Sequence, residues 1–120
     1  MQLLCALHGG RLHQHLDDLD ADPHHRALPA GYARHVVALT PGSLAARAAG
    51  GESVDVASHH HQGVAESGPK LRVTGRAPAD GAIEAVEDPA RPFLLGVLWH
   101  PEEDEGATVV RALVQAARRG

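Results

Sequence analysis

A histidine and a carboxylate stand two residues apart where a long apolar run ends. The run covers residues 93–98 and leads into Trp99-His100-Pro101-Glu102. Pro101 cannot donate to a sheet ladder and biases His100 away from helix, so we predict that a strand ends here. Side chains two residues apart in an extended chain point the same way, which places Glu102 to orient the His100 imidazole. Such a pair is two-thirds of a catalytic triad and lacks only a nucleophile.

Cys5 is the one thiol in the chain. A nucleophilic cysteine needs exposure, together with a cationic neighbour or a helix amino terminus that lowers its pKa. Cys5 instead lies between Leu4 and Ala6 in an apolar stretch of helix formers, where a buried thiol is inert packing. We therefore predict that Cys5 is not the nucleophile.

Ten histidines raise the question of a metal site, most strongly at His59, His60 and His61. Adjacent residues of an extended segment point alternately to opposite faces, so at most His59 and His61 share one. A closed zinc site requires four ligands. We predict no metal site, and keep a histidine-cluster metal binder as the third and weakest functional hypothesis.

Composition excludes several classes of protein. The chain has 120 residues, a net charge of −4 and no long basic run, which argues against a nucleic-acid partner. No apolar run approaches the roughly 20 residues of a membrane-spanning helix, and no signal peptide is recognisable. A single cysteine excludes an internal disulfide. We expect one domain over residues 1–120, located in the cytoplasm and without membrane association.

The first half of the chain predicts two helices and one clear strand. Residues 1–7 are helix formers followed by glycines, and this apolar helix has no visible amino-terminal cap. Residues 12–16 look extended, residues 17–29 form a polar loop, and residues 35–39 a strand. Ser43 is placed to cap a short helix over residues 44–49, which Gly50 closes.

The second half is richer in strands. Residues 53–58 alternate at period two, and residues 71–77 and 82–87 flank the hairpin signal Asp80-Gly81. The apolar run at residues 93–98 is typical of a strand buried on both faces of a parallel sheet. Apolar residues at helical spacing from Val109 to Val114 predict a final helix that ends near Arg119. The fold class is therefore α/β, with a β-rich middle and helices at both ends.

Several segments together resemble one family. Residues 96–102, Gly-Val-Leu-Trp-His-Pro-Glu, resemble the G-V-Q-W-H-P-E signature of class I glutamine amidotransferases. Residues 58–62 resemble the N-S-x-H-H-Q segment of the γ-glutamyl-γ-aminobutyrate hydrolase (peptidase C26) group, and residues 80–85 its D-G-x-I-E-A. Residues 1–16 resemble the helix and extended piece that follow the nucleophile in that group. The order of the motifs is the family's, across nearly the whole chain.

The resemblance implies a fold, a chemistry and site residues. The fold would be the carboxyl-terminal portion of a class I glutamine amidotransferase-like domain, which is flavodoxin-like and three-layered. The chemistry would be attack of a thiol on a small-molecule γ-glutamyl amide, without metal or cofactor. His100 would then be the general base and acid, and Glu102 the carboxylate that orients it. Ser58, His60 and Gln62 would bind substrate.

The sequence also departs from the family. The nucleophilic cysteine of the family belongs three residues before Met1, so Cys5 lies about 10 Å further along the helix. That distance is far beyond hydrogen-bond reach, which supports the prediction made for Cys5 above. Ala57 stands where the family usually has Asn, and Leu98 where it has Gln. These changes affect substrate contacts and fine geometry.

Two further hypotheses follow from the missing nucleophile. The chain is either the His–Glu portion of a cysteine-dependent γ-glutamyl hydrolase, inactive by itself, or a non-catalytic remnant or half-domain that associates with another chain. In both cases the sheet would carry an open edge beside an apolar helix. We therefore expect self-association through that edge when the chain is produced alone.

Overall fold

The computed structural model describes residues 1–14, 32–60, 62–104 and 106–120. The polar loop predicted over residues 17–29 lies outside these ranges. Within them, no helix has the length and apolar character needed to cross a membrane.

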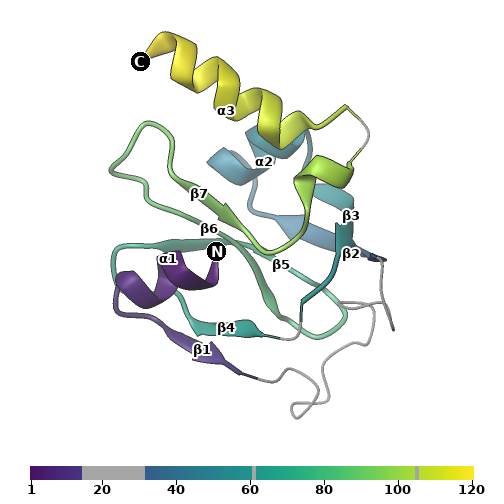
Figure 1. The fold of residues 1–120 in the computed structure, drawn as a ribbon, viewed down its shortest axis with the longest axis vertical. Helices are drawn as coiled ribbons and strands as arrows, with labels where there is room; N and C mark the ends of the chain where they lie inside the picture. Colours follow the sequence, from purple (N-terminus) through teal and green to yellow (C-terminus); the bar gives the residue numbers. More distant parts are fainter. Residues whose placement is uncertain (15–31, 61, 105) are drawn as a thin grey trace.

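The described elements begin and end with helices and are mostly strands between them (Figure 1). The helices are α1 (Gln2–Leu7), α2 (Leu44–Ala49) and α3 (Thr108–Arg119), with a 3-10 helix at Pro101–Glu103. The strands are β1 (Arg11–His13), β2 (Ala33–Leu39), β3 (Ser53–Ser58), β4 (Gly63–Glu66), β5 (Arg72–Arg76), β6 (Ile83–Glu87) and β7 (Leu95–Val97). The α/β class, the β-rich middle and the terminal helices are as predicted.

The strands form a two-stranded sheet, β1-β4, and a five-stranded sheet in the order β3-β2-β5-β6-β7. Each strand pairing described in these sheets is antiparallel. The β5–β6 hairpin turns at Gly81, whose φ of +74° lies in the left-handed region that glycine adopts without strain. The Asp-Gly signal therefore predicted this hairpin correctly.

The apolar run at residues 93–98 does not form the parallel strand that we predicted. Only Leu95–Val97 are in a strand, which lies at the end of the sheet and pairs antiparallel with β6. The reason is connectivity: β7 follows β6 after a short loop, whereas a parallel neighbour requires a crossover of a dozen or more residues. The run is apolar because Leu95 and Val97 pack against the cluster around Trp99, whereas Leu94 packs against the cluster at α1. A Cβ atom built at Gly96 would lie 3.1 Å from Leu4 Cδ2 and 3.3 Å from Met1 Cγ.

Helix α2 has the ends that its sequence predicts. The Ser43 hydroxyl accepts a hydrogen bond from the Ala46 N–H at 3.0 Å, and Gly50 closes the helix in the left-handed conformation.

Helices α1 and α3 differ from expectation in how much of their apolar surface is buried. In α1 only Cys5 is buried, and Leu3 and Leu7 are 72% and 75% exposed.

Helix α3 was predicted correctly, but most of its apolar residues do not pack. Val109 contacts the core, whereas Val110, Leu113 and Val114 are exposed. Figure 1 shows α3 beside α2, with its carboxyl-terminal half extending away from the sheet. Helical periodicity thus identified the helix without identifying its buried face.

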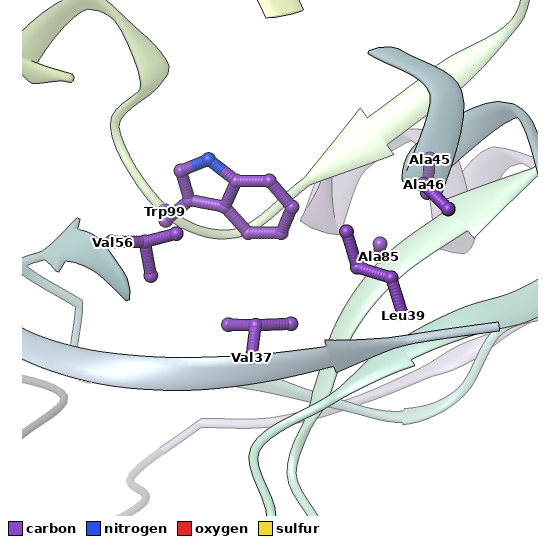
Figure 2. Close-up of a cluster of buried hydrophobic side chains, with 7 residues drawn as sticks. All are labelled: Val37, Leu39, Ala45, Ala46, Val56, Ala85 and Trp99. Atoms are coloured by element: carbon purple, nitrogen blue, oxygen red, sulfur yellow. The ribbon is translucent and has the colours of Figure 1, made fainter. Parts of the chain in front are cut away.

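The core is aliphatic except for one indole ring. Trp99 lies over Val37 and Val56, beside further small residues (Figure 2). The cluster consists of Val37, Leu39, Ala45, Ala46, Val56, Ala85 and Trp99. A second cluster joins α1 to the residues that it covers and consists of Cys5, Val64, Leu71, Ile83 and Val86. Strand β6 contributes to both clusters, with Ala85 in the first and Ile83 and Val86 in the second.

The carboxylate of Glu87, at the end of β6, is nearly buried and joins three elements. Its Oε1 accepts a hydrogen bond from Arg72 Nη2 at 2.7 Å, and its Oε2 accepts one from the Ala45 N–H in the first turn of α2 at 3.1 Å. Burial by itself raises the pKa of Glu87, but the bonds from Arg72 and from the backbone of Ala45 and Leu44 hold that pKa below its usual value. Glu87 therefore stabilises the fold as a charged group.

Substituting Glu87→Gln tests this role. We expect a loss of about 1–3 kcal/mol in the free energy of unfolding at pH 7, because a buried charged acceptor for Arg72 and α2 is removed. The pKa of Glu87 is lower in the folded state, so its contribution is present above the unfolded value of about 4.3 and is lost as the pH falls through the folded value. Urea unfolding of both proteins between pH 7 and pH 3 measures the difference.

The control is Glu66→Gln, which removes an exposed carboxylate paired with Arg11. Ion pairs between exposed side chains contribute little to stability, so this variant should unfold nearly as the parent does. A difference for Glu87→Gln that is the same at pH 3 and pH 7 would contradict a charged role.

Candidate functional site

His100 lies where the chain leaves β7 and enters the 3-10 helix. Its N–H donates to the carbonyl of Ala57 at 2.9 Å, and two residues earlier the Leu98 N–H donates to the carbonyl of Glu84, also at 2.9 Å. These bonds hold the segment between β3 and β6. Pro101 occupies the first turn of the helix, where a missing N–H costs nothing. The strand ends before His100, as the sequence predicted.

The His100 and Glu102 side chains meet. His100 Nδ1 lies 2.7 Å from Glu102 Oε1, and the bond holds the pKa of Glu102 below its ordinary value. A carboxylate can only accept, so Nδ1 carries the proton of this bond and Nε2 of the neutral ring is left as an acceptor. The His100 side chain is 35% exposed, so a reactant can reach it. The contact is made by a turn of 3-10 helix rather than by the extended chain that we expected.

Tyr32 is a neighbour of His100 that sequence reasoning missed. The two ring centroids are 4.9 Å apart with 61° between the planes, and the Tyr32 ring also lies 6.4 Å from that of His59. Edge-to-face rings at this separation attract one another and restrict rotation. Tyr32 is the only tyrosine of the chain, but no spacing in the sequence connects it with residue 100.

The three residues predicted to bind substrate lie at and beyond the end of β3. Ser58 is fully buried and next to Ala57, which holds the backbone of His100. His60 is buried, and its Nδ1 lies 3.1 Å from the carbonyl of Gln62. The Gln62 side chain donates to Gln14 Oε1 at 2.8 Å. The backbone therefore places this segment beside His100, while the side chains of His60 and Gln62 contact protein atoms.

Glu84 is a buried charge beneath this region that we did not predict as a site residue. It is 0% exposed, and its Oε1 lies 3.7 Å from His60 Nε2 and 3.8 Å from His35 Nε2. The signal in the sequence was a glutamate between Ile83 and Ala85 in a predicted strand, because a carboxylate requires a partner when it is buried. The partners come from β2 and from beyond β3, so local spacing could not identify them.

A second carboxylate near the 3-10 helix has a different environment. Burial raises the pKa of Asp104, and the Arg34 guanidinium, 3.9 Å away, opposes that shift. Among the described residues, no three His, Cys, Asp or Glu side chains converge in an arrangement that could hold a metal ion. His61 of the histidine run lies outside those residues.

Cys5 is fully buried among the apolar residues beneath α1, including Val64 and Ile83. Burial raises the pKa of its thiol, because an apolar environment disfavours the thiolate. A raised pKa and an inaccessible sulfur are the opposite of what a nucleophile needs.

The fold is that of class I glutamine amidotransferase domains, as two solved structures show. One is described as a "putative gmp synthase subunit a protein" from Thermoplasma acidophilum, with a TM-score of 0.69 at 12% identity; the match covers 98% of this chain and 53% of that one. The other is the glutaminase domain of Trypanosoma brucei CTPS with bound acivicin, with a TM-score of 0.57 at 20% identity over 73% of this chain and 40% of that one.

Sequence similarity identifies the family within this fold class. The peptidase C26 family model matches residues 1–102, and the chain therefore belongs to the peptidase C26 family. The chain is 40% identical over 117 residues to "Putative glutamine amidotransferase Rv2859c" of Mycobacterium tuberculosis, covering 97% of this chain and 37% of that protein. It is 38% identical over 109 residues to gamma-glutamyl-gamma-aminobutyrate hydrolase PuuD of Escherichia coli, covering 85% and 42%. The chain thus spans about two-fifths of the length of these relatives.

The burial of Cys5 predicts its reactivity. We expect a thiol reagent such as DTNB to label the native chain at least about tenfold more slowly than the chain unfolded in urea, because burial both hides the sulfur and disfavours the thiolate. Absorbance measurements of the labelling rate at pH 8 test this. Equal rates for the native and unfolded chains would show an accessible thiol and reopen Cys5 as a nucleophile.

Proposed function

We propose that this chain contributes the histidine and carboxylate of a cysteine-dependent site that hydrolyses γ-glutamyl amides. The observation that carries the proposal is the 2.7 Å bond between His100 Nδ1 and Glu102 Oε1 at the end of β7. Membership of the peptidase C26 family supports the reaction class.

The pair has the geometry that thiol chemistry needs. His100 Nε2 would take the proton of a thiol, and the thiolate would attack the γ-glutamyl carbonyl. The same imidazolium would return the proton to the departing amine, leaving a glutamyl thioester. His100 would then activate the water that hydrolyses the thioester. Throughout, Glu102 would hold the ring and stabilise its positive charge.

The thiol of this site would come from outside the 120 residues. Cys5 is fully buried and burial raises its pKa, so it is not available for attack. The chain also covers only 37% and 42% of two relatives, which leaves most of their length to supply other groups.

The substrate class rests on the relatives. PuuD is named a gamma-glutamyl-gamma-aminobutyrate hydrolase, and we propose a γ-glutamyl amide of a small amine for this chain as well. Ser58 and Gln62, at and beyond the end of β3, are proposed to border the substrate. Such a reaction requires no metal or cofactor, since the histidine supplies the proton transfers.

A fusion protein tests the proposal. The part of PuuD that precedes its match to this chain would be joined ahead of Met1, and release of γ-aminobutyrate from the γ-glutamyl amide would be measured. We expect turnover by the fusion and none by the 120-residue chain. His100→Asn should lower turnover by about 10²–10⁴-fold, because the general base is removed.

The matched control is His8→Asn, at the carboxyl end of α1, which removes a histidine outside the proposed site. It should leave turnover unchanged. Turnover by the isolated chain that Cys5→Ala abolishes would overturn the assignment of the nucleophile. A folded fusion without turnover would favour the alternative, a non-catalytic half-domain that associates with another chain.

We also propose that the isolated chain associates with a second copy of itself. Strand β7 is the end of the five-stranded sheet, and α1 beside it exposes Leu3 and Leu7. An unpaired strand edge next to apolar side chains is a template for pairing.

Sedimentation of the 120-residue chain between micromolar and hundred-micromolar concentration should show a mass that rises with concentration. Leu3→Glu combined with Leu7→Glu should shift the chain toward the monomer, because charges replace the apolar face of α1. The matched control, Leu113→Glu on α3, should not. A parent chain that stays monomeric at every concentration would contradict the association.

A further inference from the structure

The position of Glu84 is energetically unfavourable for a charged carboxylate. It is completely buried at the second position of β6, and removing such a charge from water is strongly unfavourable unless partners compensate. Two imidazoles face its Oε1: His60 Nε2 at 3.7 Å and His35 Nε2 at 3.8 Å. The three side chains come from different elements, so the contacts tie β6 to β2 and to the segment that follows β3.

The contact of the other ring nitrogen, Nδ1, indicates the protonation state of the His60 ring. His60 Nδ1 lies 3.1 Å from the carbonyl oxygen of Gln62, and a carbonyl only accepts, so Nδ1 bears a hydrogen. A neutral ring of this tautomer would direct the lone pair of Nε2 toward the Glu84 carboxylate, which is repulsive. An imidazolium has a hydrogen at both nitrogens, so it can donate to the Gln62 carbonyl and face the Glu84 carboxylate as an ion pair.

We propose that Glu84 is a positioning residue: its buried carboxylate holds His60 as an imidazolium and thereby fixes the end of β3 beside His100. The backbone of Glu84 serves the same arrangement, because its carbonyl accepts the Leu98 N–H at 2.9 Å. One residue therefore contacts both segments that border the proposed site. The consequence for the reaction rests on the proposed function, whereas the charge state of His60 does not.

Among the described residues, Glu84 is the carboxylate that both rings face, and one carboxylate balances one imidazolium. We assign the charge to His60 rather than to His35. His35 Nδ1 is 3.1 Å from the carbonyl of its neighbour Val36 in an exposed contact, which water can replace. The corresponding contact of His60 is partly buried, so its Nδ1 hydrogen is held in place.

The two histidines of the site then have separate roles. His60 directs both ring nitrogens to protein oxygens and has no lone pair with which to accept a proton. His100 uses only Nδ1 for Glu102 and leaves Nε2 as an acceptor. Proton transfer is therefore assigned to His100. From the sequence we expected His60 to contact the substrate, whereas here it acts by holding the end of β3 in place.

The experiment is ¹⁵N NMR of the imidazole rings in the 120-residue chain at pH 7.5, with His60→Asn used to assign the resonances. We expect both nitrogens of His60 to resonate in the protonated range in the parent chain. Glu84→Gln keeps the size of the side chain but removes its charge, so His60 Nε2 should shift to the unprotonated range. The matched control is Glu87→Gln, a buried glutamate of the same strand bonded to Arg72 and α2, which should leave the His60 spectrum unchanged.

Two results would overturn the proposal. One is a parent chain in which His60 has a single protonated nitrogen, which would mean a neutral ring facing a protonated Glu84. The other is a His60 spectrum unaffected by Glu84→Gln. If Glu84→Gln does not fold, the parent spectrum decides by itself. The experiment requires no turnover, so an inactive fusion protein leaves this inference standing, and a neutral His60 leaves the proposed hydrolase standing.

Discussion

Two backbone hydrogen bonds determine where the chemistry of this chain can lie. The N–H groups of Leu98 and His100 donate to carbonyls of β6 and β3, which are separated by two other strands in the sheet order. The chain between β7 and the 3-10 helix therefore bridges strands that do not pair with each other. Trp99, between the two donors, fills the core beneath this bridge (Figure 2). The packing of Trp99 thus supports, together with the two hydrogen bonds, the segment that carries His100.

The glutamates around this bridging segment differ in how far they are buried. Three glutamates near it have three different environments: Glu102 is exposed and bonded to His100, Glu87 is nearly buried and caps α2, and Glu84 is fully buried against imidazoles. Only the exposed one lies beside a ring that solvent can reach. A carboxylate that orients a catalytic base must share the ring with reactants, whereas a buried carboxylate can only hold its partner in place.

The spacing of residues in the sequence correctly predicted contacts between nearby residues. It did not predict structure that depends on segments far apart in the chain. The contact of His100 with Glu102, the cap of Ser43 on α2 and the hairpin at Gly81 each depend on residues within a few positions, and each was predicted. The parallel pairing of residues 93–98 was wrong, because an apolar run reports burial and not the direction of its neighbour. Strand β4 was missed because its four residues carry one large apolar side chain, Val64.

The same reasoning explains why Glu84 and Tyr32 escaped prediction while Cys5 did not. Cys5 could be judged from its neighbours in one helix, since Leu4 and Ala6 already indicate an apolar surrounding. The partners of Glu84 lie 24 and 49 residues earlier in the chain, at His60 and His35, and reach it only after β2 and β3 have paired. A buried glutamate in a strand indicates that it has polar partners, but it does not indicate which residues they are. The residues that would do the chemistry are therefore readable from sequence, whereas the residue that holds them in place emerges only from the fold.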